Sequence, residues 1–393
     1  MFDIHSPRPI LATCPREMPP VLAQEAQDLG FKPLRLLHAG VEFSGGLNEA
    51  MRLNLHLRTA HRVHMLLSQF LAESPDTLYK QAMAIPWEKI LAPDGYVSIH
   101  SHVATEAVND SRFANLRLKD AIVDRMRKKT GHRPDSGPDK TKSVVFLYWY
   151  GKECQVWLDT SGEPLNRRGY RKMPHGAPLQ ETLAAGLLLS SRFRPGHNFV
   201  NPMCGSGTLG TEAALLAMNH APGLLRDNFG FMHVLGYDIK TFQSLVAEAQ
   251  KSALPSPKGK FILTDHSPAA IKAARTNAQA AGLAEFLSFE VCDFKDTAIP
   301  EGEGVAMLNP EYGKRLGDEE KLEAVYTAIG DFFKQRCAGY TGYIFTGNLK
   351  LAKKVGLRAK RKMIFYNSKI ECRLLEYELY AGSAKTGPDT GPE

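Results

Sequence analysis

The stretch Asn201-Pro202-Met203-Cys204-Gly205-Ser206-Gly207-Thr208 decides the fold of this chain. It follows a short apolar run and precedes a helical pattern that continues to Leu216, so it predicts a glycine-rich turn between a strand and a helix. Glycine lets the backbone approach a ligand closely and adopt positive φ angles. The N-terminus of the following helix offers free N–H groups to a carboxylate. The pattern indicates the ligand-binding turn of a doubly wound α/β sheet.

The residues around this turn limit its ligand. No lysine follows the turn as it does in a phosphate-binding loop, so a nucleoside triphosphate is disfavoured. A carboxylate at the end of the second strand would bind both hydroxyls of a ribose. Asp238 and Asp265 both qualify, and we prefer Asp265, which ends the cleaner strand and precedes a capped helix. Asp293 and Phe294 could bond to and cover an adenine ring.

Asn309-Pro310-Glu311-Tyr312 directly follows the predicted strand Val305–Leu308. The lone pair of an exocyclic base amine is delocalised into the ring, so an enzyme that methylates this amine must accept its hydrogens. The side-chain oxygen of Asn309 and the carbonyl of Pro310 can do so. Tyr312 offers a surface on which an extruded base stacks, worth ~1–3 kcal/mol. An Asn-Pro turn alone is common, but together with the glycine turn it predicts an amine methyltransferase that acts mostly by orientation.

Apolar periodicity and breaks in it predict several blocks along the chain. The clearest helix in the first half runs from about Ser111 to Lys129, with Leu116, Ile122, Val123 and Met126 on its apolar side. The expected divisions are a compact α+β unit at 1–65, a second block at 66–158, a linker at 159–176, an alternating strand–helix domain at 177–382 and a frayed, disordered tail at 383–393.

Composition excludes several classes of protein. A chain of 393 residues that is 43% hydrophobic and 23% charged indicates two or three ordinary globular domains. No apolar run reaches the ~18 residues of a membrane span, and the first residues do not resemble a signal peptide. The six cysteines form no C-x-x-C pair, which argues against a metal and for reduced thiols. We therefore expect a cytoplasmic protein without a metal site.

The net charge of +7 is compatible with a polyanionic partner. Three basic clusters in separate segments favour a nucleic-acid surface. The first includes Arg127, Lys128, Lys129 and Arg133, which we expect to contact the nucleic acid; the second is Arg167, Arg168, Arg171 and Lys172; the third is Lys350, Lys353, Lys354, Arg358, Lys360, Arg361 and Lys362.

The glycine turn and the run Asn309-Pro310-Glu311-Tyr312-Gly313-Lys314-Arg315-Leu316-Gly317 resemble bacterial THUMP-domain class I S-adenosylmethionine-dependent RNA methyltransferases. Within them, the chain is most similar to the enzymes that methylate guanine N2 in 23S ribosomal RNA. The resemblance covers most of the chain and extends to segments 54–60, 118–124, 168–171, 177–185 and 274–278.

This resemblance implies a Rossmann-like catalytic domain preceded by an α+β ferredoxin-like unit and a THUMP domain that captures RNA. It implies S-adenosylmethionine as cofactor and S-adenosylhomocysteine as product, with Leu179, Glu181 and Thr182 lining the cofactor site. The expected catalytic residues are Asn309, Pro310 and Tyr312, and the expected cofactor contacts are Leu179, Glu181, Thr182, Asn201, Cys204, Gly205, Ser206, Gly207, Thr208, Asp265, Asp293, Phe294 and Asn309. The expected partner is 23S ribosomal RNA or a pre-ribosomal particle, with no membrane and no obligate protein partner.

Two departures from the family affect these expectations. The family usually has a second proline where Glu311 stands. The change is either neutral, or the Glu311 carboxylate accepts hydrogen bonds from the N1–H and amino groups of guanine and so disfavours adenine. Some members also continue into a second methyltransferase, and because this chain ends at Glu393 we expect a single activity.

Other functions stay open on the same residues. A transfer RNA guanine-N2 methyltransferase and an N6-adenine DNA methyltransferase would both use the Asn-Pro-x-Tyr motif, since each target is an exocyclic amine. The THUMP resemblance favours RNA, and ribosomal over transfer RNA rests on overall similarity alone. A non-catalytic RNA-binding assembly factor would be expected to lose Asp265 or Asn309, and both are present. A metal-dependent hydrolase is disfavoured because the histidines have no matching carboxylate pattern.

Overall fold

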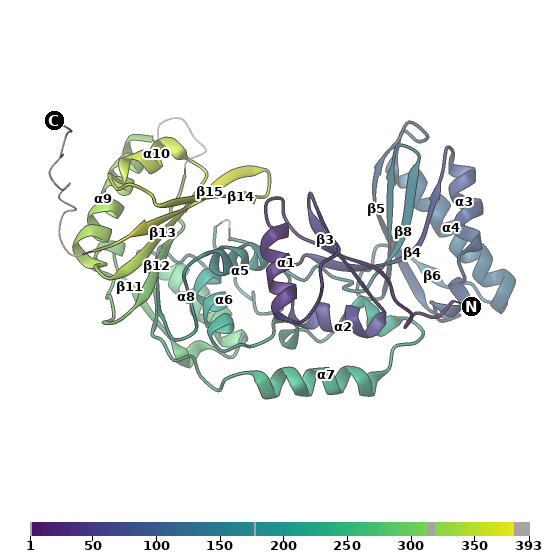
Figure 1. Cartoon of the computed structure of the whole chain (residues 1–393), viewed down its shortest axis with the longest axis horizontal. Coiled ribbons are helices and arrows are strands. Elements are labelled where there is room, and N and C mark those ends of the chain that lie inside the picture. The colour runs from purple at the N-terminus through teal and green to yellow at the C-terminus, as the bar shows by residue number, and fades with distance from the viewer. Residues whose placement is uncertain (1, 177, 313–318, 381–393) are drawn as a thin grey trace, which may run out of the picture. The chain divides into compact units, whose positions relative to one another are not determined.

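The computed structural model of the protein describes residues 2–176, 178–312 and 319–380, and the tail expected at 383–393 lies outside them. The chain forms two compact units. The first is Met1–Gly169 with Asn219–Ala253, and the second is Tyr170–Met218 with Leu254–Glu393 (Figure 1). Segment 219–253 thus belongs to the first unit, although it lies within the range expected for the alternating strand–helix domain.

One eight-stranded sheet runs through the first unit, in the order β2-β3-β1-β4-β8-β7-β5-β6. Strand β4 pairs with β1 through its first residues and with β8 along most of its length, so it joins the α+β unit and the second block in a single sheet. The strands are β1 (Arg8–Thr13), β2 (Arg35–Leu37), β3 (Gly40–Gly45), β4 (Arg62–Leu71), β5 (Tyr96–Ala104), β6 (Asp135–Ser136), β7 (Ser143–Tyr150) and β8 (Glu153–Asp159).

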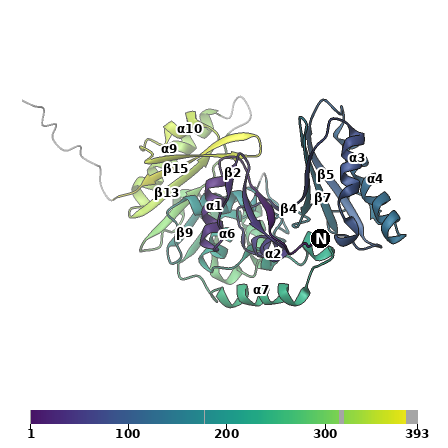
Figure 2. The ribbon, with the colours of Figure 1, turned by 45° about the vertical axis from the view of Figure 1, so that its right-hand side comes forward.

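Three helices of the first unit begin at a residue whose side chain caps them. The side chain of Ser74 caps α3, Asp110 caps α4 and Asp238 caps α7 by accepting from backbone N–H groups. Helices α3 and α4 pack side by side, and they cover the part of the sheet that contains β5 and β7 (Figure 2). The helices are α1 (Pro19–Asp28), α2 (Leu47–His56), α3 (Pro75–Ala84), α4 (Ser111–Thr130) and α7 (Ile239–Ser252), with short 3-10 turns η1 (Trp87–Lys89), η2 (Pro222–Leu225) and η3 (Gly230–His233).

Helix α4 confirms the predicted helix but corrects one residue of its apolar side. Leu116 is 52% exposed, whereas Leu118 is fully buried together with Ile122 and Met126. The helix is rich in charged residues and has few apolar ones. The apolar pattern therefore located the buried face only to within one or two residues. The face turned to the sheet therefore contains Leu118 instead of Leu116.

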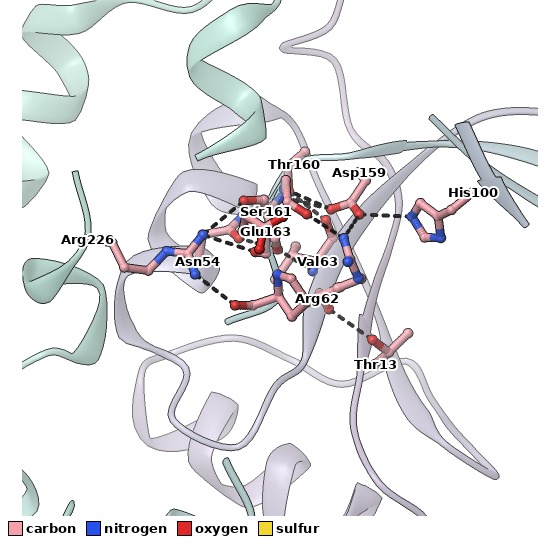
Figure 3. A network of polar contacts seen from close by, with 12 residues as sticks. Thr13, Asn54, Arg62, Val63, His100, Asp159, Thr160, Ser161, Glu163 and Arg226 are labelled. Carbon is pink, nitrogen blue, oxygen red and sulfur yellow. Dashed lines mark hydrogen bonds and ion pairs between the residues drawn. The ribbon is translucent and has the colours of Figure 1, made fainter. Parts of the chain in front are cut away.

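A buried polar network connects distant segments of the first unit (Figure 3). The Asp159 carboxylate accepts hydrogen bonds from Arg62 and, at 3.1 Å, from His100 Nε2. The Asn54 side chain bonds to both neighbouring hydroxyls, donating to Thr160 Oγ1 over 2.8 Å and accepting from Ser161 Oγ. Burial opposes the charge on Asp159, but His64, His100 and Arg62 together hold the pKa of its carboxyl well below the ordinary value.

The second unit is a seven-stranded sheet in the order β11-β10-β9-β12-β13-β15-β14. The ladders from β11 to β13 are all parallel, while β15 lies antiparallel between β13 and β14. The doubly wound α/β sheet predicted from the sequence is confirmed. The strands are β9 (Asn198–Pro202), β10 (Phe261–Asp265), β11 (Leu287–Val291), β12 (Gly304–Leu308), β13 (Tyr340–Thr346), β14 (Arg361–Asn367) and β15 (Ile370–Glu378).

The helices of this unit follow the strands in alternation. Ser267 caps α8 by accepting from the Ala270 N–H over 3.3 Å, and Pro268 occupies the first helical turn, as predicted. The core on one face of the sheet packs Phe332 and Phe333 against Ile344 and Tyr377. The helices are α5 (Glu181–Ser190), α6 (Thr208–Ala217), α8 (Pro268–Ala280), α9 (Glu319–Arg336) and α10 (Leu349–Lys354), with 3-10 turns η4 (Ala284–Phe286) and η5 (Phe294–Asp296).

We predict that His64 makes the stability of the first unit depend on pH. His64 is 2% exposed and stacks on Phe146, and burial lowers its pKa to about 4. Between pH 6.5 and pH 4 the unfolded chain binds a proton at this position that the folded chain does not. The free energy of unfolding therefore falls as pH decreases, by about 3 kcal/mol over this range.

Urea unfolding followed by tryptophan fluorescence measures this effect, because all three tryptophans (Trp87, Trp149 and Trp157) lie in the first unit. The substitution His64→Gln should remove this part of the pH dependence, while His132→Gln, at an exposed position, should keep it. The same dependence in wild type and in His64→Gln would contradict the assignment.

Candidate functional site

The candidate site lies at the carboxyl ends of β10, β9 and β12. From β9 the chain proceeds to β10 and β11 on one side, whereas β12 lies on the other side of β9 and leads to β13. The strand order therefore reverses between β9 and β12. In open α/β sheets, ligands bind outside the carboxyl ends of the strands at such a reversal.

The glycine turn after β9 adopts the conformations that its sequence predicts. Gly205 has φ +55° and Gly207, the N-cap of α6, has φ +79°. A Cβ on Gly207 would lie 2.8 Å from the Cβ of Ala274 in α8, whereas a Cβ on Gly205 would meet no atom within 4 Å. Gly207 is therefore required by its φ angle and by helix packing, and Gly205 faces open space.

Asp265, the last residue of β10, contacts this turn directly. Its Oδ2 accepts a hydrogen bond from the Gly205 N–H over 3.0 Å, and its Oδ1 accepts from the Ser267 N–H over 2.9 Å. Asp238, the other candidate from the sequence, caps α7 in the first unit by accepting from Lys240 and Thr241. The structure thus brings Asp265 to the turn and gives Asp238 a local role.

Asn277 holds the turn from α8, a role that the sequence analysis missed. Its Oδ1 accepts from the N–H groups of Lys172 and Met173, both over 2.8 Å. Its Nδ2 donates to the carbonyls of Met173 and Ser206 over 2.9 and 3.1 Å. The signal in the sequence was a polar residue on the otherwise apolar face of α8, next to Ala274 and Ala278.

Arg171 ties the segment before α5 to the same turn. Its guanidinium donates to Glu181 Oε1 over 2.9 Å, to the Leu179 carbonyl over 2.7 Å and to Ser206 Oγ over 3.2 Å. These bonds position Leu179 and Glu181 next to the turn. Thr182, also in α5, is fully buried, and its hydroxyl has no hydrogen-bond partner among the described residues.

These contacts correct the expectation that the second basic cluster (Arg167, Arg168, Arg171 and Lys172) forms part of a nucleic-acid surface. Arg168 is 1% exposed and donates to the carbonyls of Leu165 and Arg58. Arg171 is held by Glu181 and by the turn. Two of the four residues are therefore committed to interior contacts, and the cluster does not form a continuous nucleic-acid surface.

Two asparagines lie at the ends of the adjacent strands β9 and β12. Asn201 donates from Nδ2 to the Met307 carbonyl over 2.8 Å and so joins the strands. The Oδ1 atom of Asn309 is buried, and no hydrogen-bond partner for it lies in the described part of the chain. Pro310 is buried and Glu311 is exposed. Asn309 is thus an acceptor with capacity left at the carboxyl edge of the sheet.

Tyr312 is fixed by two further asparagines that the sequence analysis did not identify. Its hydroxyl accepts from Asn367 Nδ2 over 2.8 Å, and its carbonyl accepts from Asn348 Nδ2 over 3.4 Å. A Cβ on Gly347 would come within 3.2 Å of its ring, so the ring lies close over that backbone. Burial raises the pKa of the Tyr312 hydroxyl. Residues 313–318, which complete the motif of the sequence, lie outside the described residues.

The remaining predicted contacts are less direct. Phe294 is 8% exposed and packs edge-on against Phe332 in the core, which leaves little of its ring to cover an adenine. Asp293 is exposed and caps η5 by accepting from the Lys295 N–H. Cys204 is buried next to Asp265, and burial raises the pKa of its thiol. A raised pKa suppresses the thiolate, so Cys204 serves as packing and not as a nucleophile.

The residues that we expect to contact nucleic acid belong to the first unit. Arg127, Lys128, Lys129 and Arg133, at and just after the end of α4, are all exposed; we call them the α4 patch. Within residues 2–176, 178–312 and 319–380, no three His, Cys, Asp or Glu side chains gather where they could hold a metal ion. None of the helices in these ranges has the length and apolarity needed to span a bilayer.

Three segments of the chain match known protein families. Residues 168–376 match the RMKL-like methyltransferase domain, residues 9–64 the RlmL ferredoxin-like domain and residues 72–159 the THUMP domain. These matches confirm the expected fold class, a class I methyltransferase domain preceded by a ferredoxin-like and a THUMP domain.

Similar proteins extend along most of the chain. A ribosomal RNA large subunit methyltransferase K/L from Syntrophotalea carbinolica is 38% identical over 95% of this chain and 54% of that protein, so the chain spans about half of it. Slr0064 from Synechocystis sp., provisionally named an RNA methyltransferase, is 35% identical over 95% of this chain and 97% of that protein. The structure of SMU.472 in complex with SAH has a TM-score of 0.87 and 26% identity, covering 97% of this chain and all of that one. The chain belongs to the RMKL-like methyltransferase family.

Proposed function

We propose that this protein transfers a methyl group from S-adenosylmethionine to the exocyclic N2 amine of a guanosine in 23S ribosomal RNA. The observation that carries the proposal is the Asn309 side-chain oxygen, which is buried at the carboxyl end of β12 without a partner among the described residues. An unsatisfied buried acceptor costs about 1–3 kcal/mol. A base amine that donates to it would recover this energy and be oriented by it.

The surroundings of Asn309 support an entering base. Pro310 follows it directly and contributes a carbonyl without an N–H of its own. Tyr312, held by Asn348 and Asn367, gives the base a fixed ring on which to stack. Rate enhancement would come from holding the amine in line with the methyl donor.

The carboxyl edge also fits the cofactor that the family uses. Each Asp265 oxygen accepts one backbone N–H and keeps capacity for a ribose hydroxyl. Gly205 faces open space, so the turn can approach a bound group closely. The hydroxyl of Thr182 has a free bonding direction. S-Adenosylmethionine would supply an electrophilic methyl group here and leave as S-adenosylhomocysteine, as in the SAH complex of SMU.472.

RNA as substrate is supported by the THUMP domain and by the names of the relatives. The exposed α4 patch offers four cations to phosphates. We assign the substrate as 23S ribosomal RNA or a pre-ribosomal particle, and the site of action as the cytoplasm.

The first test incubates the protein with radiolabelled S-adenosylmethionine and unmodified ribosomal RNA, transfer RNA or DNA, and identifies the labelled nucleosides. We expect N2-methylguanosine in large-subunit ribosomal RNA. Asn309→Ala should lower the rate at least about 100-fold without a comparable loss of cofactor affinity, because the amine loses its acceptor. Asn309→Asp, which keeps acceptor oxygens, should retain more activity.

The outcomes of this test separate the alternatives. Label in transfer RNA alone would keep the chemistry and replace the substrate, and N6-methyladenosine in DNA would replace both base and substrate. Cofactor binding without label in any nucleic acid or in pre-ribosomal particles would rule out the proposed activity.

A substitution at Glu311 tests whether this residue makes the enzyme prefer guanine over adenine. We propose that its exposed carboxylate accepts from the N1–H of guanine, next to the amino group that Asn309 and Pro310 hold. Glu311→Gln should then slow methylation of guanosine about 10- to 100-fold, since a hydrogen bond to a charged group contributes about 1.5–3 kcal/mol. The matched control is Glu301→Gln, because Glu301 is also exposed but precedes the amino end of β12. Unchanged rate and base preference in Glu311→Gln would show that the proline-to-glutamate departure is neutral.

The α4 patch makes a separate prediction about RNA capture. Lys128→Glu combined with Lys129→Glu should weaken RNA binding and flatten its salt dependence, because each lysine that contacts a phosphate releases counterions. Cofactor affinity, measured on the same samples, should stay unchanged. Equal RNA binding by wild type and variant at physiological salt would remove the patch from the RNA interface.

A further inference from the structure

The positive charge of the chain is concentrated in one segment of the second unit. Residues 348–373 contain nine lysines and arginines and one acidic residue, Glu371, a net charge of +8, whereas the whole chain carries +7. This segment comprises α10, β14, the turn between β14 and β15, and the first residues of β15. The rest of the chain is close to neutral.

Carboxylates neutralise only part of this charge. Lys354 pairs with Glu323 over 2.8 Å, Arg361 with Glu376 over 3.2 Å and Arg373 with Glu371 over 2.7 Å, and Lys360 pairs with Glu378. The other cations are exposed, and no ion pair in the described part of the chain involves them. They are Lys350, Lys353, Arg358, Lys362 and Lys369.

Two of these exposed lysines lie next to the residues that hold Tyr312. Asn348, which caps α10 and donates to the Tyr312 carbonyl, precedes Lys350 by two positions. Asn367, which ends β14 and donates to the Tyr312 hydroxyl, precedes Lys369 by two positions. The basic segment is therefore attached at two points to Tyr312, once at its backbone carbonyl and once at its hydroxyl, and the target base would stack on the ring of this residue.

The hairpin formed by β14 and β15 also projects beyond the carboxyl end of β13. Arg373 pairs with Thr346 at the end of β13 and with Ile364 of β14. Three further pairs of β14 and β15, from Phe365 to Ile370, extend past that level (Figure 1). At 3.3 Å per residue they carry the turn with Lys369 about 10 Å beyond β13.

We infer that the start of α10 and the β14–β15 turn form a second RNA-binding surface, which grips the backbone phosphates flanking the target nucleotide. The inference rests on the proposed function. A base that reaches Asn309 must leave its stack, so the phosphates on either side must be held while it is extruded. Lysines act as phosphate binders through point charges. Lys350 and Lys369, each adjacent to an anchor of Tyr312, are placed to hold them.

The test reverses two charges at this surface and two at the opposite edge of the same sheet. The variant K350E/K369E is compared with K258E/K260E, whose exposed lysines precede the amino end of β10. Both variants change the net charge equally. RNA affinity, its salt dependence, the steady-state constants of methylation and cofactor affinity are measured for each.

We expect K350E/K369E to bind RNA about tenfold or more weakly, to lower the slope of log affinity against log salt by about 2, and to raise KM for RNA more than it lowers kcat. K258E/K260E should behave nearly as wild type, and both variants should bind the cofactor normally, which shows that they are folded. If the two variants lose RNA affinity equally, or if neither does, the surface is not an RNA grip. Failure of wild type to bind or methylate RNA would instead overturn the proposed function.

Discussion

The parallel arrangement of β10, β9 and β12 is the constraint on which the candidate site depends. Parallel strands need crossover connections, so each carboxyl end opens into a loop at the same edge of the sheet. Because the order reverses between β9 and β12, their crossovers leave in opposite directions and the loops separate above the two strands. Asn201 and Met307, which share a hydrogen bond 106 positions apart in sequence, mark this meeting point. The glycine turn and Asn309 therefore follow adjacent strands at the same edge of the sheet.

Along this edge of the sheet, the polar groups of the glycine turn are hydrogen-bonded within the described part of the protein, whereas the side-chain oxygen of Asn309 is not. The turn is pinned on several sides: the Gly205 N–H by Asp265, the Ser206 carbonyl by Asn277 and the Ser206 hydroxyl by Arg171. Its shape is thus set without any contribution from a ligand, which reduces the ordering that binding requires. The Asn309 oxygen, in contrast, has no partner among the described residues. The Oδ1 atom of Asn201 and the hydroxyl of Thr182 also lack a partner among these residues, so the site keeps hydrogen-bonding capacity while its scaffold is already bonded.

Local patterns predicted the elements of this unit well, because caps and strand runs are encoded by neighbouring residues. The capped start of α8 and the preference for Asp265 both followed from Ser267 and Pro268. Contacts between distant segments were not predictable in this way. Arg168 and Arg171 looked like surface charges because the groups that they bind lie far along the chain or in loops without periodicity. Asn277 was missed for the same reason, since its four bonds all reach segments about 70 to 105 positions away.

Segment 219–253 shows why sequence continuity is a poor guide to the units of this protein. The connection between a helix and the next strand of such a sheet needs about 2–6 residues, yet here 219–253 leaves the second unit between α6 and β10. It is stabilised within the first unit: Ala249 and Ala221 pack against Leu55, and Gly223 lies so close that a Cβ would be 2.7 Å from the Leu55 backbone. Arg226 donates to carbonyls of the 161–163 loop. Cutting the chain at 169 would strip these contacts from the first unit, so this unit needs residues from both sides of the predicted linker.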